Sequence, residues 1–422
     1  MVFPFTIIER TIPGQHIREY PHSINLNKAR QETALQLAIK QYVPADRPEP
    51  IPANAVTIIA AHGTGFPKEL YEPLWEDLYK QLRARSVPLR AIWMADVSNQ
   101  GASGVLNENI QGDTTNWYDH SRDLLHMVNH FRDEFPRPII GVAHSMGCAQ
   151  LVHLSILHPR LLSTLILFEP VILEAAFGGP NPSSFAASRK DLWPSREKAQ
   201  TSLRKSLQKW DPRVIDRFLE FGLRPVPTRL YNPDTDASVD SCAVTLTTSK
   251  HQESWSYSIA NLEAESAGLD RYLIPDWDPD VERPYMFSRP ECWSSMRNLP
   301  VIRPSVLWVF GEKSYLSPLE AQEAKMKVTG TGVGGSGGVK AGMVEKTVLK
   351  GGSHTLVLEN VDWSAKAAAD WVEKWFSRWL ADEKFWKEYL SRRSDAEMLK
   401  PSQDNLDVFT MAMGTERIKE KL

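Results

Sequence analysis

The chain has 422 residues, 42% of them hydrophobic and 24% charged, which predicts a folded protein with a sizeable core. The formal net charge of −3 argues against nucleic acid as the main partner, because phosphate binding requires a clear basic excess. No apolar run approaches the length of a membrane span, and the first residues lack the features of a signal peptide. The three cysteines, Cys148, Cys242 and Cys292, are far apart and odd in number, which indicates a reducing compartment.

The first half of the chain alternates apolar strands with helical segments. We expect strands at 5–10, 34–43, 56–61, 89–97, 138–144 and 164–169, and helices at 68–86, 117–135 and 148–158. Residues 98–116 are rich in Gly, Asn and Ser and are expected to form a loop. Continuous apolar runs such as 56–61 are typical of buried parallel strands. The alternation therefore predicts an α/β fold with a mostly parallel sheet and helices on both faces.

This alternation breaks between Val171 and about Pro300, where Pro, Trp and charged residues are frequent and the helical pieces, 197–208 and 213–221, are short. It resumes with a strand at 306–310, a helix near 318–328, a strand at 343–349 and a helix from about 361 toward 393. We therefore expect one α/β core, residues 1–170 and 301–395, with a helical lid, 171–300, inserted after the sixth of eight strands. Residues 396–422 are expected to form a C-terminal tail. The lid should cover the carboxyl ends of the strands, where active sites of open α/β sheets lie.

The segment Ala143-His144-Ser145-Met146-Gly147 follows one of these strands and opens a helix. It has the form of a nucleophile elbow, G-x-S-x-G, with alanine in place of the first glycine. The flanking residues must be small because larger side chains would collide across the sharp turn. Such a sequence also occurs in ordinary loops, so the neighbouring secondary structure decides whether its serine is read as a nucleophile. Here the strand–turn–helix context predicts Ser145 as a nucleophile.

A serine hydroxyl needs a base and preset donors for the oxyanion. We expect the base to be His354, which lies in a glycine-rich loop after the last strand and follows Ser145 in the α/β-hydrolase order Ser, acid, His. The expected donors are the backbone N–H groups of Met146 and of Thr64, the latter in the loop His62-Gly63-Thr64-Gly65. This chemistry requires no metal and no redox cofactor.

The triad acid has two candidates. In most hydrolases of this fold the triad acid follows the strand after the insertion. In this chain the position there that usually holds aspartate is Ser314. Glu312 is the nearby carboxylate. Glu169 instead ends the strand that follows the nucleophile helix, which places it at the same carboxyl-terminal edge of the sheet as Ser145. We favour Glu169 and keep Glu312 as the alternative.

These segments, Ala61 to Tyr71, Ala143 to Gly147 and Gly352-Ser353-His354, resemble the α/β-hydrolase superfamily over roughly residues 5–395. More narrowly, the chain resembles the fungal peroxisomal hydrolases of toxin and secondary-metabolite biosynthesis, including the acyl-CoA hydrolase of mycophenolic acid biosynthesis. The resemblance implies cleavage of acyl-CoA thioesters, a long lid, and a triad acid after the sixth strand, which corresponds to Glu169. It also implies a peroxisomal location.

The last three residues, Glu420-Lys421-Leu422, are similar to the S-K-L type of peroxisomal address, with a charged tail of a cytoplasmic protein as the alternative. Trp371, Trp375 and Trp379 recur every four residues, which predicts a core-facing stripe or a subunit interface. With the tail from about Lys400, this stripe makes a homodimer an open expectation.

The lid segment is rich in aromatic and basic residues. Its aromatic side chains are expected mainly to hold the lid to the sheet, and a minority to line a site for an apolar acyl chain: Trp193, Trp210, Trp255, Tyr257, Trp277, Tyr285, Phe287 and Trp293. Its first part carries basic residues that either form a solvated helix face or steer the phosphates of coenzyme A: Arg189, Lys190, Arg196, Lys198, Arg204, Lys205 and Lys209.

Taken together, the residues predict a serine hydrolase that cleaves a thioester or ester of an apolar acyl group. Acyl transfer or ring closure is an alternative on the same residues, with a hydroxyl or amine replacing water. A catalytically inactive hydrolase fold that binds a ligand is a second alternative, motivated by Ser314 in the usual acid position.

Overall fold

The computed structural model describes residues 3–174, 182–258 and 289–413. The chain divides into two compact units, Met1–Glu373 and Lys374–Leu422. All the residues expected to act in catalysis belong to the first unit.

The first unit is built on one sheet, in which the described residues form eight strands. They are β1 (Phe5–Pro13), β2 (Gln36–Pro44), β3 (Val56–Ala61), β4 (Leu89–Ala95), β5 (Ile139–His144), β6 (Thr164–Phe168), β10 (Ser305–Gly311) and β11 (Val344–Leu349). Their order is β1-β2-β4-β3-β5-β6-β10-β11. Only the β1–β2 and β2–β4 pairs within it are antiparallel. The mostly parallel eight-stranded sheet is therefore confirmed.

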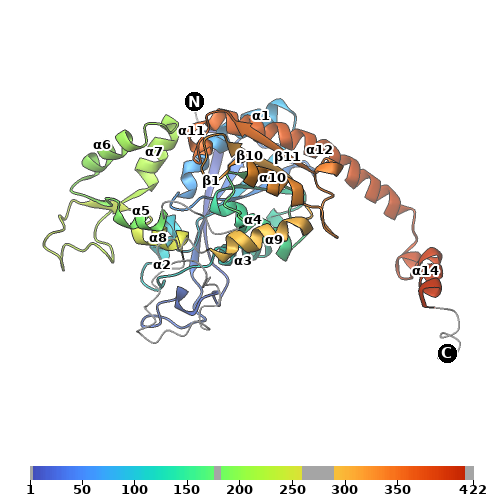
Figure 1. Cartoon of the computed structure of the whole chain (residues 1–422), viewed down its shortest axis with the longest axis horizontal. Helices are drawn as coiled ribbons and strands as arrows, with labels where there is room; N and C mark the ends of the chain where they lie inside the picture. Colours follow the sequence, from blue (N-terminus) through green and yellow to red (C-terminus); the bar gives the residue numbers. More distant parts are fainter. Residues whose placement is uncertain (1–2, 175–181, 259–288, 414–422) are drawn as a thin grey trace. The chain divides into compact units, whose positions relative to one another are not determined.

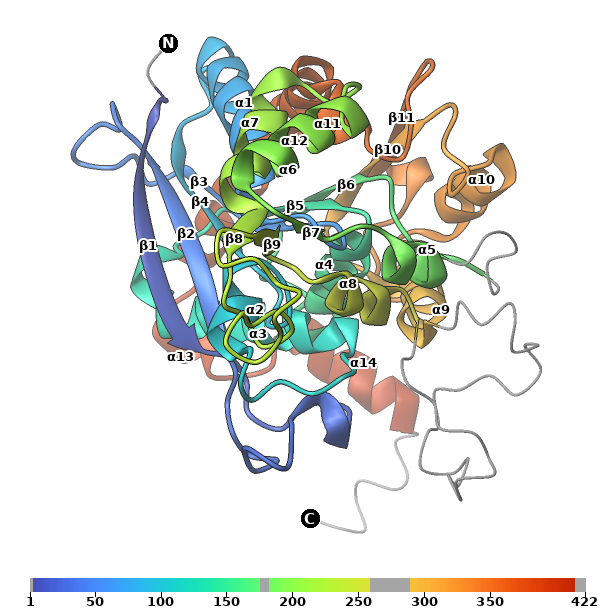
Figure 2. The same cartoon turned by 90° about the vertical axis from the view of Figure 1, so that its left-hand side faces the viewer.

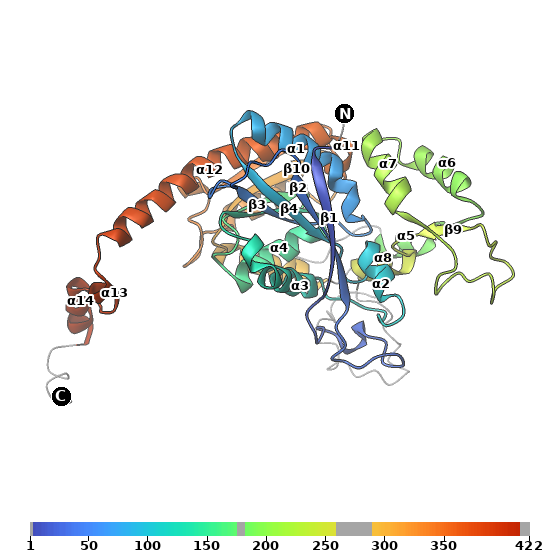
Figure 3. The same ribbon diagram turned by 180° about the vertical axis from the view of Figure 1, so that it is seen from behind.

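The central strands are apolar along their whole length because both of their faces are covered. Every residue of β3, β5, β6 and β10 is buried. Helices α3 (Trp117–His130), α4 (Met146–Leu157) and α9 (Pro290–Asn298) lie on one face of the sheet. Helix α1 (Glu72–Ala84) and the start of α12 (Val361–Ser391) lie on the opposite face (Figures 1 and 3).

The expected loop 98–116 is partly wrong, because it contains the helix α2 (Gly101–Asn107). Its glycine-rich sequence has low helix propensity. Tertiary hydrogen bonds compensate: Gly101 N–H donates to Thr248 Oγ1, and Ala102 N–H donates to Asp96 Oδ2. The first turn of the expected helix 68–86 is also different, since Lys68–Tyr71 is a 3₁₀ helix that precedes α1.

Between β6 and α9 the described chain forms four helices and a small sheet. The helices are α5 (Pro182–Ser188), α6 (Arg196–Ser206), α7 (Pro212–Phe221) and α8 (Lys250–Tyr257). The strands β7 (Leu192–Trp193), β9 (Val244–Leu246) and β8 (Leu223–Pro225) form a three-stranded antiparallel sheet that we did not predict. These elements gather on one side of the main sheet (Figure 1) and stand in front of it when that side faces the viewer (Figure 2). The exact division into core, lid and tail stays a prediction.

The remaining α-helices of the described residues are α10 (Leu319–Val328), α11 (Leu356–Glu359), α13 (Asp395–Met398) and α14 (Gln403–Met413). Trp371 of the predicted tryptophan stripe is buried, and its indole N–H donates to Thr164 Oγ1. Among the helices that the structure describes, none has both the length and the apolar character needed to cross a membrane.

Candidate active site

Ser145 lies at a strained turn between β5 and α4. Its backbone has φ +55° and ψ −117°, a conformation that non-glycine residues rarely adopt, and such strain is typical of functional turns. The turn is closely packed, because a Cβ added to Gly147 would lie 2.4 Å from the carbonyl oxygen of Ala61 on β3. The Ser145 N–H donates to Phe168 O at 2.9 Å, which ties the turn to the end of β6.

His354 lies between Ser145 and Glu169. Its Nε2 is 3.0 Å from Ser145 Oγ, and its Nδ1 is 3.1 Å from Glu169 Oε2. The side chain of His354 is 20% exposed, whereas that of Glu169 is fully buried. The alternative acid, Glu312, is exposed and accepts a hydrogen bond from Gly351 N–H. The structure thus brings Glu169 to the imidazole and leaves Glu312 outside.

The Glu169 carboxylate is held by donors as well as by the histidine. Gly311 N–H donates to its Oε1 at 2.5 Å, and the hydroxyl of Ser317 lies 3.4 Å from its Oε2. A buried carboxylate requires such partners, because desolvation otherwise disfavours its charge. Glu169 also has a positive φ, +49°, where β6 ends. Ser314 does not face the histidine in this arrangement; its hydroxyl accepts from Leu316 N–H.

The two expected oxyanion donors come together from separate segments. The side chains of Thr64 and Met146 touch, with Thr64 Oγ1 3.4 Å from Met146 Sδ. Within the described residues, neither backbone N–H has a hydrogen-bond acceptor. The neighbouring N–H groups are engaged: Gly63 N–H donates to Tyr71 Oη, and Gly65 N–H donates to Gln100 Oε1. That these two N–H groups stabilise a developing negative charge stays a prediction.

A hydrogen-bonded chain that we did not predict connects the three segments that hold the predicted catalytic residues. Gly63 N–H donates to Tyr71 Oη at 2.9 Å, Tyr71 Oη lies 2.9 Å from His144 Nδ1, and His144 Nε2 lies 3.0 Å from His354 O. An amide N–H only donates and a carbonyl only accepts, so the protons of this chain have one arrangement when the imidazole is neutral. Tyr71 must donate to Nδ1, and His144 must donate from Nε2.

This arrangement requires a neutral His144, and its surroundings agree. Burial, and after it the neighbouring His354, lower the pKa of His144 to about 3. Burial likewise raises the pKa of Tyr71 well above its usual value, so the phenol keeps its proton. The position of His144 directly before the nucleophile was the only sequence signal for this chain of contacts.

The predicted lid residues occupy several different environments. Trp210 packs edge-on against Phe66, which stacks on His144, so this aromatic lies near the site. Trp193 is buried. Trp277, Tyr285 and Phe287 lie outside the described residues.

The three arginines in the lid's first part are engaged with protein groups. Arg189 pairs with Glu253 and Arg204 with Asp216, while Arg196 donates to two backbone carbonyls. This pairing weakens the expectation that these residues receive phosphates.

Comparisons with known proteins agree with this fold. The model of the alpha/beta hydrolase family matches residues 58–368. The type I acyl-CoA thioesterase mpaH' of Penicillium brevicompactum is 41% identical over 404 residues, which cover 91% of each chain. The thioesterase mpaH of Penicillium roqueforti is 38% identical and covers 99% of each. Among solved structures, the peroxisomal alpha-beta-hydrolase Lpx1 of Saccharomyces cerevisiae has a TM-score of 0.67 at 17% identity, covering 99% of both chains, which shows the shared fold. The chain therefore belongs to the alpha/beta hydrolase family.

Proposed function

We propose that this hydrolase is a serine thioesterase that cleaves acyl-CoA thioesters with an apolar acyl group. One observation carries the proposal: Ser145 Oγ, both ring nitrogens of His354 and the buried Glu169 carboxylate form a continuous chain with contacts of 3.0 and 3.1 Å. The thioesterase names of the relatives, which share about 40% of the sequence, support the substrate class. The wider resemblance suggests a role in secondary-metabolite biosynthesis.

In the proposed acylation step, Ser145 Oγ attacks the thioester carbonyl while His354 Nε2 takes the hydroxyl proton. Glu169 stabilises the imidazolium that forms and holds its Nδ1–H in place. The N–H groups of Thr64 and Met146 receive the negative charge of the tetrahedral intermediate. Its collapse breaks the C–S bond, and His354 returns the proton to the departing sulfur, which leaves as a free thiol.

Deacylation repeats the sequence with water. His354 removes a proton from a water molecule, whose oxygen attacks the acyl-serine ester. The second tetrahedral intermediate uses the same two N–H donors. Its collapse breaks the C–O bond to Ser145, His354 returns its proton to Ser145 Oγ, and the carboxylic acid is released. The alternative of acyl transfer differs only in this step, where an alcohol or amine would take the place of water.

The direct test is hydrolysis of a series of acyl-CoAs of increasing chain length. A thiol reagent measures the coenzyme A that is released. We expect turnover that depends on chain length, with free carboxylic acid as the acyl product. An ester or amide product in the presence of an added acceptor would favour acyl transfer. Absence of turnover with every acyl-CoA, in folded protein, would contradict the proposal and favour the inactive alternative.

A peroxisomal location remains part of the proposal, based on the expectation for Glu420-Lys421-Leu422, which lie outside the described residues. Fusing residues 411–422 to a fluorescent protein tests it. Punctate signal that overlaps a peroxisomal marker is expected, and a diffuse cytosolic signal would contradict it.

A further inference from the structure

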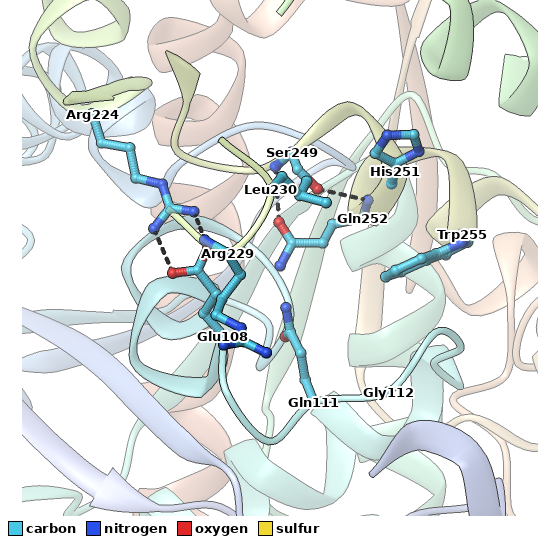
Figure 4. Close-up of a pocket in the computed structure, with 10 residues that line it drawn as sticks. All are labelled: Glu108, Gln111, Gly112, Arg224, Arg229, Leu230, Ser249, His251, Gln252 and Trp255. Carbon is cyan, nitrogen blue, oxygen red and sulfur yellow. Dashed lines mark hydrogen bonds and ion pairs between the residues drawn. The ribbon is translucent and has the colours of Figure 1, made fainter. Parts of the chain in front are cut away.

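A pocket of about 300 Å³ lies between the core and the lid, away from the catalytic serine. One wall comes from the residues that follow α2, including Glu108 and Gln111. The opposite wall comes from β8, the loop that follows it, and the first turns of α8. Figure 4 shows the side chains of these elements around a shared space.

Two glutamine side chains give this pocket an incomplete set of hydrogen bonds. Gln252 is only 7% exposed, and its Oε1 accepts from Ser249 N–H at 2.8 Å. Its amide Nε2 makes no hydrogen bond with a described residue. Gln111 Oε1 is buried and likewise has no partner among them. In Figure 4 both carboxamides extend into the space between their elements. Buried polar groups are usually paired, so the unpartnered Gln111 Oε1, together with the Gln252 amide beside it, points to a polar ligand.

The same pocket combines positive charge with an aromatic surface. Glu108 forms a bidentate ion pair with Arg224, at 2.5 and 3.1 Å. Arg229 also lines the pocket; it is an exposed residue that forms no salt bridge with a described residue, although its charge, like that of Arg224, lowers the pKa of Glu108. With two arginines and one glutamate, the pocket has an excess of positive charge. The half-buried indole of Trp255 and the ring of His251 complete the lining.

We propose that this pocket binds the adenine nucleotide end of coenzyme A, an inference that rests on the proposed acyl-CoA thioesterase function. A purine stacks on Trp255, because the π-face of a base packs favourably against an aromatic side chain. The carboxamides of Gln252 and Gln111 supply a donor and an acceptor for the adenine edge, which glutamine matches in geometry. The phosphates lie against Arg229, whose guanidinium forms charge-assisted hydrogen bonds with phosphate oxygens.

The position of α8 relates this pocket to the catalytic centre. Gln252 and Trp255 line the pocket, whereas Glu253 on the same helix lies against the oxyanion loop, 2.8 Å from a Cβ added to Gly65. Gln100 also connects the two, because it accepts from Gly65 N–H and donates to Ser256 on α8. The pocket is thus separated from the oxyanion loop by about one helix diameter, ~10 Å. The pantetheine arm of the substrate spans this separation.

The test compares acyl-CoA with the acyl thioester of N-acetylcysteamine, which carries the same reacting group without the nucleotide. We expect Arg229→Glu and Trp255→Ala to raise KM for acyl-CoA about 10-fold each, a change of about 1.4 kcal/mol. KM and kcat for the truncated thioester should stay unchanged. Lys205→Glu on α6 is the matched charge reversal, and its KM for acyl-CoA should equal that of the wild type.

Equal changes for both thioesters, or an increase in KM only in Lys205→Glu, would overturn the assignment of the pocket. If Trp255→Ala does not fold, Arg229→Glu alone tests the pocket. Arg229 is an exposed residue, so its substitution should leave the fold intact. Calorimetric titration with adenosine 3′,5′-bisphosphate gives an independent result. We expect binding to wild-type protein that weakens about 10-fold in Arg229→Glu, and no binding to wild type would refute the pocket. Failure of wild type to hydrolyse either thioester would instead refute the proposed function.

Discussion

The Tyr71 hydroxyl offers a sharp test of how the catalytic segments are held in place. Tyr71→Phe removes one oxygen and keeps the ring, which packs against Trp75 and His144. Two buried groups lose their partner: the Gly63 N–H and His144 Nδ1, each 2.9 Å from that oxygen. The change therefore loosens the oxyanion loop without touching Ser145 or His354.

The expected magnitude follows from these two groups. Leaving a buried donor or acceptor unsatisfied costs about 1–3 kcal/mol, so the variant should be measurably less stable. Complete loss of an oxyanion donor lowers kcat by about 100- to 1000-fold. Tyr71→Phe displaces the Thr64 N–H and does not remove it, so we expect kcat to fall by about 10- to 100-fold. KM should change by less than about 2-fold, because a transition-state interaction is lost while ground-state binding is kept.

Tyr118→Phe is the matched control for this experiment. Its hydroxyl is also hydrogen-bonded, to Glu291 O at 2.9 Å and to Ser295 Oγ at 2.8 Å, but it contacts no catalytic residue. Both variants should show a lower melting temperature, whereas only Tyr71→Phe should lose kcat in a thiol-release assay. If kcat of Tyr71→Phe equals that of the control, the chain through Tyr71 and His144 has no role in positioning the catalytic groups.

Three further changes test other parts of the account. Glu169→Gln should lower kcat by about 10⁴-fold, as loss of a triad carboxylate does elsewhere, while Glu312→Gln should retain activity; the reverse result would make Glu312 the acid. Gly63→Val should abolish turnover in folded protein, because its Cβ would lie 2.9 Å from His144 Nδ1 and 3.2 Å from Ser145 Cβ, and wild-type activity would contradict the oxyanion assignment. His120 is buried without a hydrogen-bond partner among the described residues, and burial lowers its pKa well below the usual value. Below pH 6.5 the unfolded protein therefore binds one proton more than the folded protein, so the free energy of unfolding decreases as the pH is lowered. His120→Leu should reduce the slope of unfolding free energy against pH by about 1 kcal/mol per pH unit, measured by denaturant titrations at pH 5–6. An unchanged slope would mean that His120 is charged in the folded protein.

The strands and the nucleophile turn were predictable because their signals are local. A strand buried on both faces is apolar throughout, as β3 and β5 are, and a nucleophile elbow needs small residues around its serine. The position of Glu169 also followed from the order of the strands along the chain, since the carboxyl ends of parallel strands meet at one edge of the sheet. The structure then placed its carboxylate 3.1 Å from His354.

The features that escaped prediction depend on contacts between distant residues. Tyr71 and His144 are 73 residues apart, and His144 contacts the carbonyl of a residue 210 positions later. No pattern within one segment encodes such contacts. Helix α2 is similar, because hydrogen bonds from its N–H groups to Asp96 and Thr248 compensate for its poor helix propensity. The pocket beside α8 also assembles from three separate segments.

The central claim is that Ser145 is the nucleophile of an active thioesterase. Its most direct test is labelling of the folded chain with a fluorophosphonate, followed by peptide mass spectrometry and by measurement of residual acyl-CoA hydrolysis in the same sample. We predict a single adduct on the peptide that contains Ser145, with hydrolysis lost in proportion to labelling. An unlabelled Ser145, or full hydrolysis by protein that is completely labelled there, would contradict the account.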